Sequence, residues 1–375
     1  MATVLRRDRA VPGGGVMALR DPAPESVRVM VIDDSLTVRT VFSRMIDREA
    51  DLAVVAQAGT AEQGLMVLRS TRVDVVLLDL EMPGIGGLEA LPQILATATG
   101  AQVLVVSSLT ADGAHATVSA LRMGAADTML KPRPGGFNED YRGNLLGKIR
   151  ALGGKTTPSE PGTGRAPAAR PVRPPVPKRP KVLAIGASTG GIHALNLFLR
   201  QLPDSFDLPI LITQHLPDSF IPVFARQMET AADRETVLAD ENVAIAPRRI
   251  IIAPGRGHMI VRARHGEHVT GLAYHPVRSG CRPSVDPMFE TLADAYDGHV
   301  AAVLLSGMGR DGTEGAERIA AAGGGVYAQD EASCAVWGMP RAVTEAGLAC
   351  AVGSPETLAD KVVAAASGLG TVPWR

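Results

Sequence analysis

The chain has 375 residues, and its 38 lysines and arginines nearly balance its 39 acidic residues, for a formal net charge of −1. This length accommodates two ordinary domains, and a hydrophobic content of 46% excludes a disordered chain. The near-neutral charge argues against nucleic acid as the main partner, because binding to phosphates requires a basic surplus.

Cysteine use and hydropathy indicate the cellular setting. Cys281, Cys334 and Cys350 are too few and too scattered for a disulfide framework or a cysteine-rich zinc site, so we expect a reducing, cytoplasmic location. No apolar run approaches the roughly 20 residues of a membrane span, and we expect no direct membrane insertion. Residues 1–26 lack the apolar segment of a signal peptide and are predicted to be a flexible N-terminal extension.

The first patterned half of the chain alternates β-branched runs with segments that carry apolar residues at helical spacing. Strands are predicted at Val27–Ile32, Ala53–Gln57, Val73–Leu78, Val103–Val106 and Asp127–Leu130. Helices are predicted at Leu36–Arg48, Ala61–Arg69, Gly87–Leu95, Ala114–Met123 and Asn138–Leu152. Strands separated by helices in this way imply a parallel α/β sheet covered on both faces.

Acidic and polar side chains follow the strands of this half. Asp33 and Asp34 follow the first strand, and Asp79 follows the third. Because ligands bind outside the carboxyl ends of the strands in an open parallel sheet, these carboxylates should lie at one edge. Three close carboxylates repel one another unless a cation lies among them, and oxygen ligands select Mg²⁺ or a similar ion. Ser107 ends the fourth strand and Lys131 follows the fifth, at the same edge.

This edge is suited to accept a phosphoryl group on an aspartate, because a metal and a lysine stabilise charge on the phosphoryl oxygens. Taken singly, each residue has an ordinary interpretation. Asp33 and Asp34 could cap the next helix, Asp79 could be a turn residue, and Lys131 could be a solvated surface lysine. Their joint placement at successive strand ends favours the phosphoryl interpretation.

Residues 27–148 resemble the flavodoxin-like receiver domain of bacterial response regulators. The resemblance is carried by Asp33-Asp34-Ser35, Leu78-Asp79-Leu80-Glu81-Met82-Pro83, Val106-Ser107-Ser108 and Lys131-Pro132. It implies Asp79 as phosphoacceptor and as Mg²⁺ ligand together with Asp34, and Asp33 at or near the metal. It also implies contacts from Ser107 and Lys131 to the phosphoryl group. Receivers often carry an aromatic switch residue three positions before the lysine, where this chain has Thr128.

A proline-rich segment separates the two patterned halves. Repeated prolines forbid helix interiors and sheet centres, so residues 151–180 are predicted to be an extended linker. The predicted domains are therefore a receiver over residues 27–150 and a second α/β domain over residues 181–370.

The second half repeats the alternation of strands and helices. Strands are predicted at Lys181–Ile185, Pro209–Gln214, Arg249–Ala253, His258–Ala263, His299–Leu305 and Gly325–Ala328. Helices are predicted at Gly191–Gln201, Phe220–Thr230, Val285–Tyr296, Gly312–Ala322, Pro340–Ala346 and Glu356–Ser367. We expect a doubly wound, mostly parallel sheet with a hairpin added around Arg248–Leu272.

Ser188 lies at the apex of a predicted strand–turn–helix, in the spacing Gly186-x-Ser188-x-Gly190. Flanking glycines allow a tight bend that exposes a nucleophilic hydroxyl. The same layout could hold a phosphate at the helix N-terminus, or Ser188 could simply cap the helix. The phosphate interpretation lacks both the lysine of a nucleotide-binding loop and an acidic partner about 20 residues later.

A serine nucleophile needs a base, and the base needs an orienting acid. His215 follows the second strand of this half, and Asp311 follows the strand that ends near Leu305, so both should share the rim with Ser188. Rival residues are His193 and His258 for the base and Asp286 for the acid. Each of these residues also has an ordinary interpretation as a turn, a cap or a satisfied polar group.

Residues 181–367 resemble the catalytic domain of chemotaxis protein-glutamate methylesterases, the CheB family. The motifs that carry the resemblance are Ile185-Gly186-Ala187-Ser188-Thr189-Gly190-Gly191, Thr213-Gln214-His215-Leu216-Pro217, Ala253-Pro254-Gly255, Arg282-Pro283-Ser284-Val285-Asp286 and Ser306-Gly307-Met308-Gly309-Arg310-Asp311-Gly312. The resemblance implies Ser188 as nucleophile, His215 as base and Asp311 as orienting acid. It also implies an oxyanion or substrate-rim site near Met308, with Thr189 as a further candidate.

Together the two resemblances imply a phosphorylation-regulated esterase. It would hydrolyse glutamyl methyl esters on chemoreceptors to glutamate and methanol, and deamidate receptor glutamines. The implied partners are a histidine kinase of the chemotaxis type and methylated chemoreceptors. The implied cofactor is Mg²⁺ in the receiver, with none in the catalytic domain. We further expect the receiver to restrict access to Ser188. The alternative is a phospho-switched binding module with a degenerate catalytic half.

Overall fold

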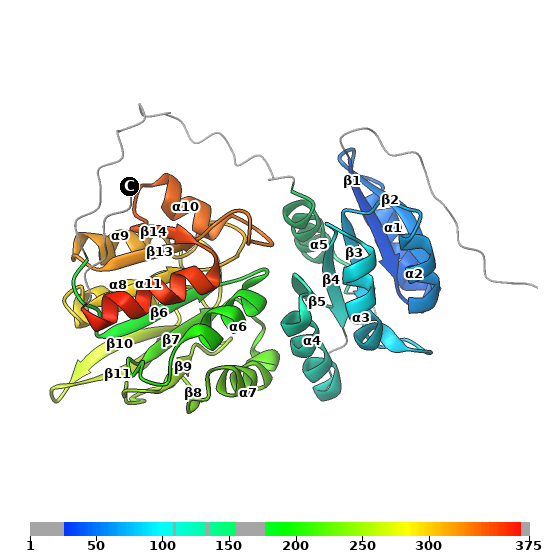
Figure 1. Cartoon of the computed structure of the whole chain (residues 1–375). Coiled ribbons are helices and arrows are strands. Elements are labelled where there is room, and N and C mark those ends of the chain that lie inside the picture. The colour runs from blue at the N-terminus through cyan, green and yellow to red at the C-terminus, as the bar shows by residue number, and fades with distance from the viewer. Residues whose placement is uncertain (1–25, 108–109, 133–135, 155–176, 369–375) are drawn as a thin grey trace, which may run out of the picture.

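The computed structural model describes residues 26–107, 110–132, 136–154 and 177–368. Two α/β units follow one another along the chain (Figure 1). Most of the predicted N-terminal extension and of the predicted linker lies outside the described residues. No helix among the described residues is long and apolar enough to cross a membrane.

The N-terminal unit is a five-stranded parallel sheet in the order β2-β1-β3-β4-β5. Its strands are β1 (Val27–Ile32), β2 (Leu52–Ala58), β3 (Val75–Asp79), β4 (Gln102–Ser107) and β5 (Asp127–Leu130). Its helices are α1 (Leu36–Ile46), α2 (Ala61–Leu68), α3 (Gly86–Thr97), α4 (Ala111–Met123) and α5 (Glu139–Leu152). This is the predicted flavodoxin-like arrangement, with helices on both faces of the sheet (Figure 1).

The C-terminal unit is built on a seven-stranded parallel sheet in the order β14-β13-β12-β6-β7-β9-β8. The strands of this sheet are β6 (Val182–Ala187), β7 (Ile210–Gln214), β8 (Thr236–Leu238), β9 (Ile250–Ile252), β12 (Val300–Leu304), β13 (Gly325–Gln329) and β14 (Ala351–Gly353). The helices are α6 (Gly191–Gln201), η1 (Asp218–Phe220), α7 (Ile221–Ala232), α8 (Asp286–Ala295), α9 (Thr313–Ala321), α10 (Met339–Glu345) and α11 (Pro355–Ser367).

The edges of this sheet differ from the sequence-based expectation. The edge strands β8 and β14 were not predicted, because each has only three residues and neither is a continuous run of buried apolar residues such as β9. The expected hairpin around Arg248–Leu272 is also corrected. It consists of β10 (His258–Arg264) and β11 (Glu267–Ala273), which form a separate two-stranded sheet, whereas β9 belongs to the parallel sheet.

Alternation along the central strands divides the core into two faces of each sheet. In β6, Leu183 and Ile185 belong to one buried cluster, whereas Val182 and Ala184 belong to another. Both faces are therefore covered, and β6, β7 and β12 are apolar except at the carboxyl end of β7, which closes with Thr213 and Gln214. The polar groups of this region are consequently confined to the strand ends and the loops that follow them.

The two units pack against each other through α4 and β5 of the first and the region after β6 of the second (Figure 1). Helix α4 contacts α6, α7 and η1. Val336 of the C-terminal unit belongs to the same buried cluster as Met129 of β5. The amino end of β5 in the N-terminal sheet is thereby placed beside the residues that follow the carboxyl end of β6.

Candidate active site and receiver site

The nucleophile candidate Ser188 directly follows β6, and His215 directly follows the neighbouring strand β7. Ala187 and Gln214 are paired in the ladder, and the His215 amide donates to the Ala187 carbonyl over 3.0 Å. The two candidates therefore lie side by side because their strands are parallel neighbours in register.

The turn after Ser188 depends on small residues. Gly190 has a φ of 77°, and a Cβ there would lie 2.6 Å from both Ala335 Cβ and Ser306 Oγ. Gly307, from the loop after β12, approaches so closely that its Cβ would lie 2.8 Å from Ser188 Cβ. Glycine at these positions allows two loops to meet at the serine.

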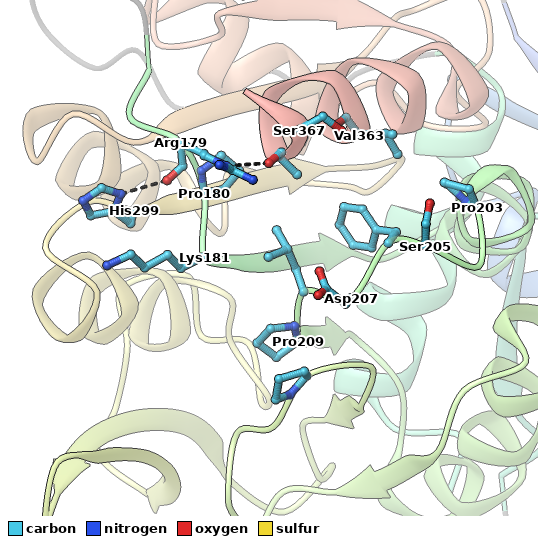
Figure 2. A pocket seen from close by; sticks show the side chains of 14 residues that line it. Arg179, Pro180, Lys181, Pro203, Ser205, Asp207, Pro209, His299, Val363 and Ser367 are labelled. Carbon is cyan, nitrogen blue, oxygen red and sulfur yellow. Dashed lines mark hydrogen bonds between the residues drawn. The ribbon is translucent and has the colours of Figure 1, made fainter. Parts of the chain in front are cut away.

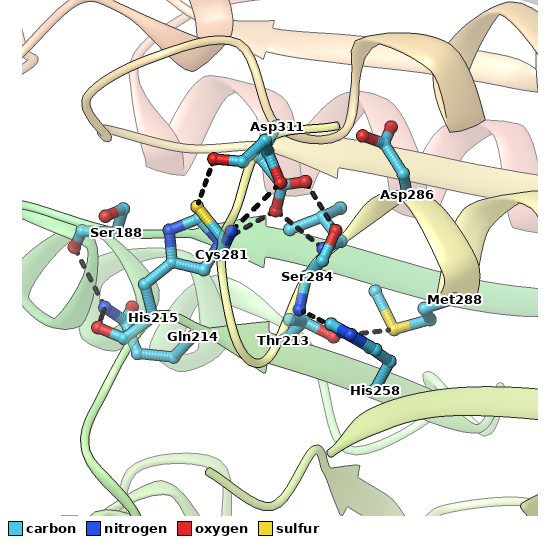
Figure 3. A network of polar contacts seen from close by, with 12 residues as sticks. Ser188, Thr213, Gln214, His215, His258, Cys281, Ser284, Asp286, Met288 and Asp311 are labelled. Carbon is cyan, nitrogen blue, oxygen red and sulfur yellow. Dashed lines mark hydrogen bonds and ion pairs between the residues drawn. The ribbon is translucent and has the colours of Figure 1, made fainter. Parts of the chain in front are cut away.

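His215 and Asp311 form a direct hydrogen bond. His215 Nε2 lies 2.7 Å from Asp311 Oδ2, and the ring lies between Ser188 and Asp311 in the view of Figure 3. The Asp311 carboxylate also accepts from Ser284 Oγ at 2.6 Å and from the Val285 amide at 2.7 Å. These donors hold the acid in one orientation, as the orienting member of a catalytic triad requires.

The pairing of partly buried His215 with buried Asp311 changes both proton affinities. Burial has the largest single effect and lowers the pKa of His215, but the hydrogen bonds and charges of Asp311 and Cys281 together outweigh it and raise that pKa to about 9. Burial acts in the opposite direction on Asp311, where hydrogen bonds from His215 and Ser284 hold the pKa far below its usual range. The pair is thus set up to stabilise an imidazolium beside Ser188.

In the structure as described, Ser188 Oγ and the His215 ring are not hydrogen-bonded to each other. Because Nε2 is engaged by Asp311, Nδ1 is the ring nitrogen left to accept a proton from the serine. Catalytic hydrogen bonds often tighten only when substrate is bound, so this separation is compatible with a nucleophile–base pair.

Three rival candidates have other positions. His193 is exposed, with Nδ1 3.5 Å from the Arg122 carbonyl in the N-terminal unit. His258 accepts from the Ser284 amide through Nδ1, and its Nε2 lies 3.1 Å from the His275 carbonyl. Asp286 accepts from the Gly315 amide at 2.9 Å. None of the three is placed to take the proton of Ser188, although His258 supports the loop that holds Asp311.

The two oxyanion or substrate-rim candidates come from two different loops. Met308 is 44% exposed, in the loop between β12 and α9 that approaches the serine. Thr189 is buried, and its hydroxyl donates to Asp127 Oδ2 of β5 over 2.5 Å. The neighbouring Gly190 amide donates to the Ala126 carbonyl, also over 2.5 Å. The N-terminal unit therefore touches the two residues directly after the candidate nucleophile.

Sequence reasoning missed Ser284, Cys281 and Asp127 as members of this region. Cys281 lies within 4.8 Å of His215 and Asp311, measured between potential ligand atoms. Ser284 belongs to the Arg282-Pro283-Ser284 motif and Cys281 directly precedes it, so this motif was the available signal. Asp127 carried no signal, because its partner Thr189 belongs to the other unit.

In the N-terminal sheet, the acidic candidates converge at one edge. Ligand atoms of Asp33, Asp34 and Asp79 all lie within 4.8 Å of one another. Lys131 Nζ lies 2.6 Å from Asp79 Oδ2 and 3.0 Å from Asp33 Oδ2. Burial raises the pKa of Asp79 to about 6, although Lys131 favours its ionised form.

Ser107 is fully buried at the end of β4, one position beyond the residue that pairs with Asp79. Its Oγ accepts a hydrogen bond from Thr117 Oγ1 of α4 over 2.7 Å. A hydroxyl at the candidate phosphoryl site is thus joined to the helix that packs against the second unit. Thr128 is buried on β5 without a partner for its hydroxyl among the described residues.

A pocket of about 520 Å³ lies away from both the Ser188 site and the acidic edge of the N-terminal sheet (Figure 2). Lys181, Pro209 and His299 line it, just before β6, β7 and β12 begin. It therefore lies at the amino ends of the strands, opposite the rim that carries Ser188.

Two family models match the chain. The model of the CheB methylesterase matches residues 183–362, and that of the response regulator receiver domain matches residues 29–136. A protein-glutamate methylesterase/protein-glutamine glutaminase 1 of Paramagnetospirillum magneticum is 40% identical over 366 residues, or 90% of this chain and 96% of that protein. A protein of the same activity name from Rhodopseudomonas palustris is 39% identical over 379 residues, or 94% of this chain and 98% of that protein.

Among solved structures, the CheB methylesterase catalytic domain of Thermotoga maritima is 33% identical with a TM-score of 0.48. The match covers 49% of this chain and 97% of that chain.

Proposed function

The chain belongs to the CheB family of protein-glutamate methylesterases/protein-glutamine glutaminases, and on this premise we propose that Ser188, His215 and Asp311 are its catalytic triad. Membership makes the chain an enzyme, a carboxylic ester hydrolase and glutaminase with a receiver domain. The observation that carries the triad is the 2.7 Å contact of His215 with Asp311 at the strand end beside Ser188.

The proposed reaction is acyl transfer through the serine. Ser188 Oγ attacks the side-chain carbonyl carbon of a glutamyl methyl ester while His215 Nδ1 accepts the hydroxyl proton. The tetrahedral intermediate collapses, and His215 returns the proton to the departing methanol. Water then attacks the acyl-enzyme with His215 again as base, releasing glutamate and restoring Ser188. A glutamine side chain follows the same path and releases ammonia.

The developing oxyanion needs hydrogen-bond donors near Ser188. The amides of Thr189 and Met308 are the proposed donors, because neither donates to another described residue and Gly307 brings the second loop against the serine. The exposed Met308 side chain would lie on the substrate rim.

Chemoreceptors carrying methylated glutamates are the proposed substrates, and a histidine kinase of the chemotaxis type is the proposed phosphodonor. Asp79 would accept the phosphoryl group, and Ser107 and Lys131 would contact it. Asp33, Asp34 and Asp79 present only carboxylate oxygens, the ligand type that Mg²⁺ takes. When bound there, Mg²⁺ would neutralise phosphoryl charge. We retain residues 27–150 and 181–370 as the two domains and 151–180 as the linker.

Control of the esterase by the receiver is the second part of the proposal. Its support is the contact of Ala126 and Asp127 with Gly190 and Thr189, directly after the nucleophile. In this arrangement the receiver covers one side of the rim. Phosphorylation would shift the population toward an open arrangement.

Replacing Ser188 by alanine tests the catalytic assignment. We expect Ser188→Ala to fold and to lose on the order of 10³-fold or more of methanol release from methylated receptor. An organophosphonate should label the parent but not this variant. Ser219→Ala, at an exposed serine of η1, serves as the matched control and should still be labelled.

Methanol release that survives in Ser188→Ala would overturn the triad. The alternative function, a phospho-switched binding module with a degenerate catalytic half, predicts neither labelling nor methanol release from the parent protein.

A further inference from the structure

Two clusters of potential metal ligands occur among the described residues. The first is the all-carboxylate cluster of the receiver. The second joins His215, Cys281 and Asp311, with one ligand atom from each lying within 4.8 Å of the other two. The second cluster offers nitrogen, sulfur and oxygen, so it differs from the first in the cations it prefers. Thiolate and imidazole favour Zn²⁺ and related ions over Mg²⁺.

Cys281 reaches this position from the loop between β11 and α8. Its sulfur contacts the Ser279 carbonyl at 3.8 Å, and Figure 3 shows it against the His215 ring. Cys281 and His215 are only partly buried, so a cation can reach them from solvent. The other two cysteines are poor ligands, because burial raises the pKa of Cys334 to about 12 and that of Cys350 to about 11.

The three ligand atoms lie within 4.8 Å of one another, and a tetrahedral ion requires them to be somewhat closer or farther apart. Bonds of about 2.0–2.3 Å to zinc place neighbouring ligand atoms roughly 3.2–3.6 Å apart. The 2.7 Å separation of His215 Nε2 and Asp311 Oδ2 would widen by about half an ångström or slightly more. Ser284 Oγ and the Val285 amide already fix the carboxylate, as supporting groups do in zinc sites.

We propose that His215 Nε2, Cys281 Sγ and Asp311 Oδ2 bind Zn²⁺ or a similar thiophilic divalent cation, and that the bound ion reversibly inhibits the esterase. The thiol releases its proton to solvent on binding. The ion takes the place of the proton on Nε2, so the neutral imidazole carries its proton on Nδ1. That nitrogen then cannot accept the proton of Ser188. The cation is an inhibitor in this proposal, not a cofactor.

The experiment uses the full chain and two readouts. The first is methanol release from methylated receptor across a buffered Zn²⁺ series, with Mg²⁺ held in excess to occupy the receiver. Each variant is compared with its own metal-free rate. We expect inhibition that a chelator reverses, and at least about tenfold weaker sensitivity in Cys281→Ser. The double variant Cys334→Ser/Cys350→Ser is the matched control and should keep the sensitivity of the parent.

The second readout is the thiolate-to-metal absorption band of bound Co²⁺. It should appear in the parent, in the double control variant and in Ser188→Ala, and be absent from Cys281→Ser. The inhibition readout rests on the proposed function, in which His215 is the catalytic base, whereas the band depends only on the metal ligands. The catalytic triad and the metal site can therefore fail separately.

Three outcomes would overturn the proposal. The proposed metal site would be ruled out if the Co²⁺ band were missing in the parent, or if it persisted in Cys281→Ser. If the band depends on Cys281 but Zn²⁺ does not inhibit methanol release, the proposed inhibition would be ruled out.

Discussion

His215 links the proton chemistry of the site to its neighbours. The ion pair with buried Asp311 favours the charged imidazole, which is the form that follows proton transfer from the serine. A base must nevertheless be neutral before it accepts that proton. The same contact that stabilises the reaction therefore reduces the fraction of active enzyme at neutral pH.

This balance predicts the pH dependence. Because the pKa of His215 is raised to about 9, the imidazole is mostly protonated below that pH. We expect kcat/KM for methanol release to increase from pH 7 toward pH 9 and then level off. Asp311→Asn removes the negative partner, so its rise should occur at lower pH, with a plateau reduced by roughly 10³- to 10⁴-fold. Identical profiles for the parent and Asp311→Asn would contradict the role of this pair.

Some residues of the site could be located from the sequence and others could not. Ser188, His215 and Asp79 each adjoin the end of a buried apolar strand, and the parallel ladders align those ends. Cys281 and Ser284 approach from a loop whose path no local pattern encodes. The supporting role of His258 likewise depends on the separate β10–β11 hairpin, which packs outside the main sheet.

At the scale of elements, β5 connects the two proposed sites. Lys131 follows this strand and pairs with Asp79 at the receiver edge. Asp127 begins the strand, pairs with Lys148 of α5 and accepts from Thr189 of the other unit. A shift of β5 or α4 on phosphorylation would therefore change the contacts of the two residues that follow Ser188.

Asp127→Ala tests this connection. The variant leaves Thr189 without its charged acceptor, and a hydrogen bond to a charged group contributes about 1.5–3 kcal/mol. We expect basal methanol release to increase by several-fold up to about a hundredfold, and the further effect of a phosphodonor to shrink. Asp74→Ala is the matched control, because Asp74 pairs with Arg28 within the same unit and far from the interface. Equal basal rates in Asp127→Ala, Asp74→Ala and the parent would contradict a restraining contact.

The element boundaries show what local patterns can resolve. The central strands β6, β7 and β12 are continuous apolar runs and were predicted within two residues. The edge strands β8 and β14 have three residues each and depend on backbone pairing with β9 and β13, so their sequences carry little signal.

At the scale of the whole molecule, the interface between the two units contains buried apolar side chains in addition to its hydrogen bonds. Buried apolar side chains from both units form a continuous cluster that includes Leu121 of α4 and Ile192 of α6. The proposed closed state is therefore held by packing and hydrogen bonds together, and its opening requires an energetic input from the receiver.

Phosphorylation should provide that input. A small phosphodonor with Mg²⁺ is expected to increase methanol release by the full chain, because the new charge on Asp79 changes its contacts with Lys131 and Ser107. Asp79→Asn should keep the basal rate and lose the response. A response of equal size in Asp79→Asn, or none in the parent with phosphorylation verified by mass, would overturn the proposed control.

The sequence by itself determined the α/β class, the alternation of strands and helices, and the placement of Ser188, His215 and Asp79 at strand ends and of Asp311 before a helix. These features depend on hydrophobic periodicity and on turn residues, which are local properties of a chain. Tertiary structure decided which of these groups touch: the His215–Asp311 pair, the approach of Cys281, and the contact of Asp127 with Thr189. The His215–Asp311 and Asp127–Thr189 contacts join residues 96 and 62 positions apart. They arise from packing of sheets and loops against each other, which no short segment encodes.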